Sequence, residues 1–390
     1  MGYVAIKGGE TAIQNAERLV AFYRVKSKTT PLEVEQIRTQ FRKALDKIMS
    51  EGSLYAPEHA ALALKQVEGD LFEGAFMLRA FRATLNRSYF SEMLDTDSMQ
   101  IERRVSSAFR DIPGGQVLGP TRDYVLRLLN TDIVKESLGS VSSFLSEQER
   151  KELAEGASPD ASQFPRIINF LKERGHLKPS PEKKNERVFD VTREAVKYPA
   201  PRSATMQMLA RGEQGGMTSM AYSSVRGFGD MEPSVGELRV GKCQVKVRDR
   251  RNRVRCIGRI RLTEADVVTK VKEGNRDKVP YMTHGYGLCF GQNELKAVSM
   301  AILDRAIRYG DEEEPACQQE FVLYHTEGVE SYGFTNHLKL PHYVTFQSGL
   351  SNVRQAMQRK EEAQRKAAFG VTGTDAKKIK DIPDPRSMYR

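Results

Sequence analysis

Two of the chain's six histidines, His337 and His342, lie close enough in the sequence to share a metal ion. Their spacing points the side chains apart on a regular helix and to opposite faces of a regular strand. Pro341 forbids a regular helix between them and favours an extended Leu340, so a bend could bring the imidazoles together. Two converging imidazoles are half of a tetrahedral zinc site. From the spacing alone, a chance pair in which one histidine caps a turn is slightly the better interpretation.

Two other stretches contain residues that could bind an anion or a polar ligand. Lys7 precedes a Gly-Gly turn between a predicted strand and a predicted helix, where backbone amides can meet an anion. A plain turn is the simpler alternative. In the glycine- and proline-rich loop 111–124, the residues that could grip a ligand are Gln116, Arg122 and Asp123. Packing of this loop between two helices is an equal alternative.

The stretch 284–291 is predicted to be a second glycine-rich loop, which opens a helix capped by Asn293. Its glycine spacing differs from the dinucleotide-binding fingerprint, so we predict no Rossmann site. The positive end of a helix dipole at this point still favours a negatively charged ligand.

The elements that must position these residues change in character along the chain. Residues 1–176 show helical periodicity, the segment 177–202 is rich in proline and charge and is typical of a linker, and 203–350 contain alternating strand patterns. A polar helix and a disordered basic tail are predicted for 351–390. We therefore predict an α+β protein, in which a helical N-terminal region is followed by a mixed α/β C-terminal domain with antiparallel strands.

The individual elements follow from apolar spacing, with periods of 3.6 for helices and 2 for strands. The predicted helices are 11–23, 32–48, 57–67, 71–86, 145–153, 164–173, the helix after Asn293, and 346–369. The predicted strands are 3–6, 217–225, 243–247, 254–262 and 320–325, of which the third and fourth form an antiparallel hairpin.

Composition limits the classes of function. A chain of 390 residues that is 39% hydrophobic favours two or three domains. It has no apolar run of bilayer length and no secretory signal, so we expect no association with a membrane. The four cysteines are scattered, without a Cys-x-x-Cys motif, so neither a disulfide framework nor an iron–sulfur cluster held by this chain alone is expected. We expect the protein to be located in a reducing cytoplasm.

The net charge of +10 is concentrated in two segments. Residues 242–261 hold nine Lys or Arg against one Asp, and residues 351–390 hold ten against five acidic residues. The rest of the chain is therefore slightly acidic, which disfavours a general nucleic-acid-binding surface. The cations of the hairpin mostly lie opposite its apolar residues, a pattern that fits a solvated face at least as well as a phosphate-binding one.

Four stretches taken together, 3–10, 111–120, 284–306 and 320–344, resemble the PhnI family of the bacterial carbon–phosphorus lyase system. The resemblance runs in the family's order from residue 1 to about residue 350. It implies a role in phosphonate catabolism: with PhnG, PhnH and PhnL, such a subunit displaces the purine of ATP by methylphosphonate to give α-D-ribose 1-methylphosphonate 5-triphosphate. The resemblance also implies that the subunit, in the absence of its partners, has nucleosidase activity on ATP or GTP.

The resemblance also implies a core complex with PhnG, PhnH and PhnJ, further PhnK-type partners, and two copies of this chain. The radical-generating iron–sulfur cluster of that complex belongs to PhnJ. The family's H-x4-H motif binds zinc near the PhnJ contact, and this motif corresponds to His337 and His342. No other His or Cys is close in sequence, so we favour a Zn²⁺ site completed by a partner subunit.

The implied reaction breaks an N-glycosidic bond, so it needs a carboxylate near C1′ and a general acid for the departing base. The candidates adjoin glycine-rich turns and are Asp123, Glu237 and Glu294. The triphosphate and the phosphonate need cations and backbone amides. The candidate binding residues are Lys7, Gln116, Arg122, Arg226, His284, Gly285, Gly287 and Gly291.

Two other functions remain open. The chain could be a non-catalytic scaffold of the complex that supplies a shared zinc site, in which case the purified chain, tested alone and with its partners, would release no base from ATP or GTP. It could instead be a nucleic-acid-binding module that uses the hairpin 242–261 and the tail. Binding by such a module would fall steeply with salt concentration.

Overall fold

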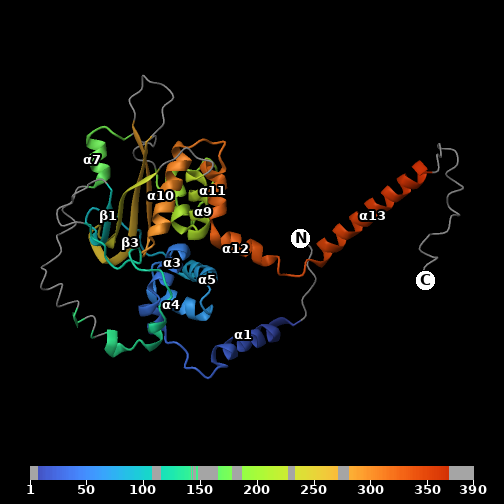
Figure 1. Cartoon of the computed structure of the whole chain (residues 1–390), viewed down its shortest axis with the longest axis horizontal. Coiled ribbons are helices and arrows are strands. Elements are labelled where there is room, and N and C mark those ends of the chain that lie inside the picture. The colour runs from blue at the N-terminus through green and yellow to red at the C-terminus, as the bar shows by residue number, and fades with distance from the viewer. Residues whose placement is uncertain are drawn as a thin grey trace, which may run out of the picture. The chain divides into compact units, whose positions relative to one another are not determined.

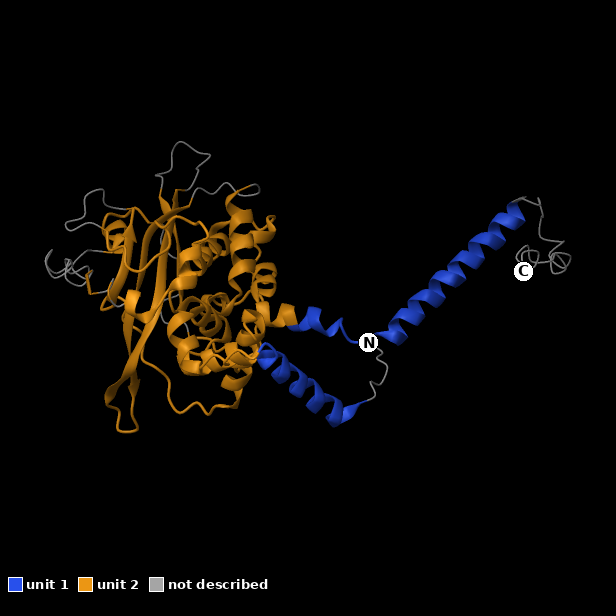
Figure 2. Cartoon of the chain, turned by 60° about the horizontal axis from the view of Figure 1, so that its bottom comes forward, with its two compact units in different colours: residues 1–27, 333–390 blue, residues 28–332 orange. Residues whose placement is uncertain are grey.

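The computed structural model describes residues 8–107, 116–141, 143, 146–147, 166–177, 187–226, 233–270 and 281–368. They form two compact units (Figure 2), one from 28–332 and the other from 8–27 with 333–368. The strand predicted at 3–6, most of the helix predicted at 145–153 and the tail beyond 368 lie outside the described residues. The α+β class is confirmed, whereas the domain boundaries set at 176 and 203 stay a prediction.

The larger unit is built on an antiparallel sheet with the strand order β1–β2–β3–β4 (Figure 1). Its strands are β1 (Gln100–Ser106), β2 (Ser234–Arg248), β3 (Val254–Lys270) and β4 (Met282–Phe290). The predicted hairpin is confirmed by the pairing of β2 with β3, and Asn252 closes its turn at φ 62°. Strand β1 comes from the region predicted to be helical, so residues on both sides of the predicted linker contribute to one sheet.

Helix α10 (Glu294–Tyr309) lies against one face of this sheet because β4 presents glycines to it. A Cβ atom at Gly285 would overlap the carbonyl oxygen of Ala301, and one at Gly287 would overlap that of Ala297. The prediction of a glycine-rich loop in this stretch is therefore wrong, since the residues form β4. Alternate glycines leave one strand face without side chains, and the helix backbone occupies that space.

Three further helices surround α10, namely α8 (Arg202–Arg211), α9 (Gln214–Val225) and α11 (Gln319–Thr326). The strands predicted at 217–225 and 320–325 are wrong, because both segments are helical. The Glu213 carboxylate caps α9 by accepting hydrogen bonds from the amides of Gly215 and Gly216. The buried core of these helices is Leu209, Met217, Ala221, Met300, Leu303, Val322 and Leu323.

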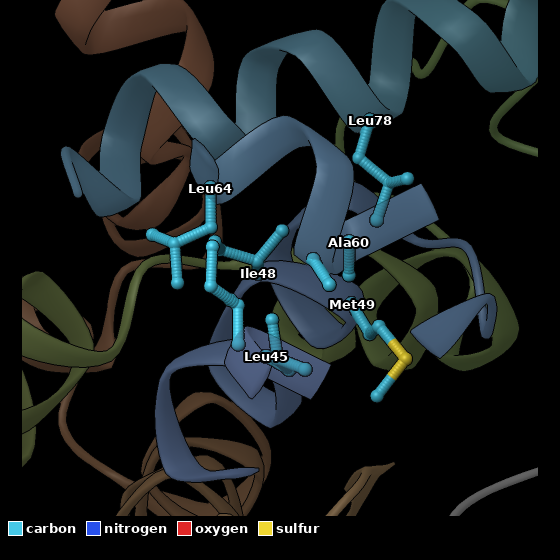
Figure 3. Packing of buried hydrophobic residues seen from close by; sticks show 8 residues of the cluster. Leu45, Ile48, Met49, Ala60, Leu64 and Leu78 are labelled. Carbon is cyan, nitrogen blue, oxygen red and sulfur yellow. The ribbon is translucent and has the colours of Figure 1, made fainter. Parts of the chain in front are cut away.

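A layer of helices comes from residues 34–84 and consists of α2 (Val34–Gln40), α3 (Arg42–Gly52), α4 (Pro57–Gln66) and α5 (Leu71–Thr84). The helices predicted at 57–67 and 71–86 are confirmed, and the Asp70 carboxylate caps α5. The helix predicted at 32–48 is divided at Phe41 and begins with a capping box between Glu33 and Gln36. The core of this layer (Figure 3) includes Ile37, Leu45, Ile48, Met49, Ala60, Ala61, Leu64 and Leu78.

The smaller unit contains α1 (Gly9–Val25) and α13 (Tyr343–Ala368), which confirm the helices predicted at 11–23 and from 346 to 368. Helix α12 (Gly328–His337) begins in the larger unit and ends in the smaller one. The remaining elements are η1 (Thr131–Lys135), α7 (Ile167–Glu173) and η3 (Pro315–Cys317). No helix in the described ranges is long and apolar enough to cross a membrane.

The close approach of α10 to β4 gives a first prediction. Replacing Gly285 by alanine places a methyl group against the carbonyl of Ala301, so the free energy of unfolding should fall by about 1–3 kcal/mol. Urea denaturation followed by circular dichroism measures this change. Gly349→Ala is the control, because Gly349 lies in α13 with no atom within 4 Å of the added Cβ. Equal urea midpoints for Gly285→Ala and the parent would contradict the packing argument.

Candidate functional site

The face of the sheet opposite α10 carries a group of charged and polar side chains, here called the polar face. Strand alternation separates Glu264 and Asp266 from Ala265 and Val267, which pack toward α10. Helix α7 lies over the polar face, on the other side of the sheet from α10 (Figure 1). The members of the polar face are Arg104, Glu237, Arg239, Glu264, Asp266, His284 and Tyr286 on the strands, together with Arg166 at the start of α7.

Glu264 is the centre of this group. Its carboxylate accepts hydrogen bonds from the Arg239 Nε at 3.0 Å, the Arg166 Nη2 at 3.0 Å and the Tyr286 hydroxyl at 2.7 Å. The Glu264 side chain is 1% exposed and that of Arg239 is 6% exposed, so their charges are removed from water. A buried carboxylate is tolerated when cations and donors surround it in this way.

Asp266 connects this centre to His284, one of the predicted binding residues. The His284 Nε2 lies 2.8 Å from one carboxylate oxygen, and the Arg166 Nη2 lies 3.0 Å from the other. Burial alone would raise the pKa of Asp266, but the hydrogen bond from His284 and the charge of Arg166 outweigh burial and lower it. The ionised carboxylate can only accept, so the Nε2 of His284 carries a proton and Nδ1 remains to exchange one.

Tyr286 is held as a neutral hydrogen-bond donor. Burial raises its pKa, and the negative charge of Glu264, which accepts the hydrogen bond from its hydroxyl, raises it further. The pKa of Arg166 also changes: burial would lower it, but the charges of Glu264 and Asp266 dominate and raise it. Tyr286 therefore stays neutral and Arg166 stays charged around neutral pH.

Glu237, one of the three predicted catalytic carboxylates, belongs to the polar face but not to a turn. It lies within β2, is 1% exposed, and accepts a hydrogen bond from the Arg104 Nε at 2.7 Å. Its second oxygen accepts from the amide of Ile167 at 3.2 Å, which fixes the start of α7. The expectation that Glu237 adjoins a glycine-rich turn is wrong, and its contacts position α7 and β1.

The other two predicted carboxylates, Asp123 and Glu294, meet at Arg103 on the α10 side of the sheet. Arg103 lies 2.5 Å from each carboxylate and is itself 3% exposed. The side chain of Asp123 is 47% exposed and that of Glu294 is 17% exposed, so this group borders solvent. The structure thus divides the predicted carboxylates between the two faces of the sheet.

The predicted binding residues are dispersed. Gln116 exchanges hydrogen bonds with the backbone of Ser106 and holds its loop to β1. Arg122 and Arg226 are exposed, and Lys7 lies outside the described residues. Gly285 and Gly287 serve the packing of α10, as described above. Gly291 has φ 72°, and a Cβ there would lie 2.5 Å from Asp46, so it fits a tight turn after β4.

Sequence reasoning missed the residues at the centre of the polar face, which are Arg104, Arg166, Arg239, Glu264, Asp266 and Tyr286. The signal for two of them is present in β3. Glu264 and Asp266 alternate with apolar residues in a strand that is buried from Leu262 to Thr269. Acidic residues on the second face of a fully buried strand are costly unless they are paired, so they mark a functional or structural network.

His337 and His342 are brought together in the smaller unit. His337 ends α12, His342 directly precedes α13, and their ring centroids are 5.2 Å apart. The His337 Nδ1 bonds to the carbonyl of Phe334, and the His342 Nδ1 bonds to that of Leu340 at 2.7 Å. A carbonyl can only accept, so both Nδ1 atoms are protonated and each neutral ring keeps its lone pair on Nε2.

This tautomer is the one that zinc-binding histidines adopt, with the other ring nitrogen oriented by a backbone carbonyl. The donor set therefore fits a metal, although two imidazoles do not complete a tetrahedral site. Among the described residues, no group of three or more His, Cys, Asp or Glu side chains is arranged to hold a metal ion. The zinc site stays a prediction, as do its remaining ligands.

Comparison with known proteins assigns the chain to a class. A family model described as bacterial phosphonate metabolism protein (PhnI) matches residues 2–361. The fold and its polar face thus belong to a protein of bacterial phosphonate metabolism. The match covers most of the chain, and the chain belongs to the PhnI family.

Three relatives agree with this assignment. A putative C-P lyase subunit protein, HtxH of Stutzerimonas stutzeri, is 43% identical over 91% of this chain and 95% of its own length. Two relatives named α-D-ribose 1-methylphosphonate 5-triphosphate synthase subunit PhnI are also similar. The one from Rhizobium meliloti is 41% identical over 95% of this chain and 98% of its own. The one from Escherichia coli is 40% identical over 91% and 98%.

The buried pair at the centre of the polar face gives a second prediction. Glu264→Ala leaves the buried Arg239 without its main partner, so the free energy of unfolding should fall by about 3–5 kcal/mol. Chemical denaturation measures this change. Glu35→Ala is the control, because Glu35 pairs with Arg38 on the solvent side of α2 and its loss should leave stability nearly unchanged. Similar small effects of both substitutions would show that Glu264 does not hold the polar face together.

Proposed function

We propose that this chain is a subunit of an α-D-ribose 1-methylphosphonate 5-triphosphate synthase in a carbon–phosphorus lyase system. With PhnG, PhnH and PhnL it displaces the purine of ATP by methylphosphonate. The observation that carries the proposal is the match over nearly the full length of two relatives that bear this name. In the reaction, the bond between C1′ and the purine nitrogen breaks, a phosphonate oxygen bonds to C1′, and the departing purine takes up a proton.

The polar face has the side chains that this reaction needs. His284 and Arg166 are partly exposed, at 21% and 18%, so a substrate can reach them. Arg166 can bind a phosphate or phosphonate oxygen, since a guanidinium forms strong charge-assisted hydrogen bonds with such groups. His284 can deliver a proton to the purine from Nδ1. Glu264 is a positioning residue, because it holds Arg166 in place, and Asp266 orients His284.

The carboxylate that stabilises positive charge at C1′ has three candidates. Asp266 is close to His284, whereas Asp123 and Glu294 lie together on Arg103 at the other face. A single reaction centre uses one face only. Substitutions on the two faces therefore distinguish the two locations, and a nucleosidase reaction of the chain alone would use the same residues.

The third prediction tests this function by chromatographic detection of free adenine from ATP and methylphosphonate. Adenine should appear when this chain is combined with PhnG, PhnH and PhnL, and omission of the chain should abolish it. His284→Asn should lower the rate about 10²- to 10⁴-fold, which is the usual contribution of general acid–base catalysis. Its thermal unfolding should remain close to that of the parent.

Asp123→Asn is the matched variant on the other face and should leave the rate nearly unchanged. A large loss in Asp123→Asn with an unaffected His284→Asn would move the reaction centre to the Arg103 side. If no combination containing this chain releases adenine, the synthase function fails and the scaffold alternative gains support.

We further propose that His337 and His342 bind Zn²⁺ at a site completed by a partner subunit, for which PhnJ is the expected partner. The protonated Nδ1 atoms and the facing rings support this proposal. When bound, Zn²⁺ would act as a Lewis acid toward a substrate oxygen. The unpaired cysteines, Cys243, Cys256, Cys289 and Cys317, support a reducing cytoplasmic location.

The fourth prediction concerns this metal. Plasma emission spectrometry should find little zinc on the isolated chain after dialysis and about one zinc per chain in the assembled complex. Replacing either His337 or His342 by alanine should lower the zinc content of the complex. His325→Ala is the control, because His325 lies on α11 with its Nδ1 bonded to the carbonyl of Phe321. Stoichiometric zinc on the isolated chain would refute a shared site.

A further inference from the structure

The larger unit contains a cavity of 270 Å³ between the helical layer and the edge strand β4. Its apolar lining, here called the apolar wall, includes Leu94, Leu262, Leu288 and Phe290. Its polar lining, here called the polar wall, includes Ser50, Arg82, Gln207 and Arg211. Cavities with apolar walls and a few fixed polar groups are the usual form of a small-molecule site. Neither the polar face nor the histidine pair includes the residues of this polar wall.

Positive charges gather around Arg82. Arg82 and Arg211 border the cavity, and Arg79 and Arg87 lie close enough to Arg82 to affect its pKa. Two carboxylates pair with three of these four arginines. Glu327 pairs with Arg79 at 2.5 Å and with Arg211 at 3.1 Å, while Asp190 pairs with Arg87 at 2.6 Å. The fourth arginine, Arg82, has no carboxylate within ion-pair distance among the described residues, and this charge borders the cavity.

Arg82 is held in this position by little else. Its only hydrogen bond within the described ranges is a long one, 3.4 Å from Nη1 to the carbonyl of Ser53. A guanidinium has five N–H donors, so most of those on Arg82 remain for a ligand. Burial lowers the pKa of Arg82, and the like charges of Arg211, Arg79 and Arg87 lower it further. An anion in the cavity would relieve this repulsion.

A buried lysine lies behind the wall. Lys296 is fully buried, and its Nζ donates to the Ser50 hydroxyl at 2.7 Å. That hydroxyl in turn donates weakly to the carbonyl of Ala210 at 3.3 Å. Because Ser50 and Ala210 both line the cavity, an anion there could replace the carbonyl as acceptor. Ser50 would then donate to the ligand while it accepts from Lys296, the pKa of which is lowered by burial.

We propose that this cavity binds a small organic oxyanion, with the charged head group on Arg82, Arg211 and Ser50 and the organic substituent against the apolar wall. The choice of a phosphonate head group rests on the proposed function, whereas the oxyanion site itself rests on the cavity. A bare inorganic ion would fill the polar side only and leave Leu262 and Leu288 uncovered, so an anion with an apolar substituent fits better.

The fifth prediction is tested by isothermal titration calorimetry on the full chain, without nucleotide or partner subunits. The probes are phenylphosphonate, phenyl phosphate, benzoate and inorganic phosphate. Phenylphosphonate should bind about tenfold or more tightly than inorganic phosphate, because only the former covers the apolar wall. Arg82→Gln should weaken phenylphosphonate binding about tenfold or more, since a charge-assisted contact is lost.

Two further variants keep the test decisive. Ala210→Leu fills the cavity without changing any charge and should also abolish phenylphosphonate binding. Arg38→Gln is the matched control, because Arg38 lies on the exposed side of α2 and pairs with Glu35. Its affinity should equal that of the parent. Melting temperatures of all variants establish that each is folded under the titration conditions.

The outcomes separate this inference from the proposed function. Equal phenylphosphonate affinities of Arg82→Gln and the parent would overturn the site, whereas tighter binding of benzoate than of phenylphosphonate and phenyl phosphate would overturn the choice of a phosphonate head group. Equal binding of phenyl phosphate and phenylphosphonate would support the site and show that it does not distinguish a P–O–C from a P–C linkage. Adenine release by the assembled complex together with a failed titration would leave the synthase function standing. A successful titration with no adenine release would support the oxyanion site and contradict the synthase function.

Discussion

The close approach of the α10 backbone to β4 is the constraint on which the larger unit depends. It requires Gly285 and Gly287, because any side chain there would occupy the space of the helix carbonyls. Because side chains alternate between the two faces of a strand, the residues between and beside these glycines point to the opposite face of the sheet. His284 and Tyr286 are those residues. One packing requirement thus places two chemically active side chains on the polar face.

The polar face is stable only because its charges are mutually compensated. Asp266 and Glu264 share Arg166, and Arg239 completes the group from the neighbouring strand. Removing such ions from water is costly, and the cost is offset by ion pairs and hydrogen bonds among them. Arg166 and His284, which are partly exposed, are held in place by these contacts. Fixed donors and acceptors of this kind are what catalytic sites require.

The sequence predicted helices better than strands, for a physical reason. Helices such as α4 and α5 carry local signals, including Pro57 at the first turn and the Asp70 cap. The segments 217–225 and 320–325 have short apolar runs whose helical state depends on packing around α10. The polar face was missed because its pairs join residues about 20 to 170 positions apart. No local sequence pattern indicates such pairing. The His-x4-His spacing is local, and it predicted that His337 and His342 lie close together.

The cavity at Arg82 shows how an unbalanced charge differs from a balanced one. On the polar face, carboxylates neutralise the buried cations, and the network closes on itself. Near the cavity, Glu327 and Asp190 pair with three arginines, whereas Arg82 has like-charged neighbours and no ion-pair partner among the described residues. A protein that only needed a stable layer could place a neutral residue at position 82 without an electrostatic cost. Retaining a half-buried cation beside an apolar cavity is therefore better explained by a negatively charged ligand than by stability.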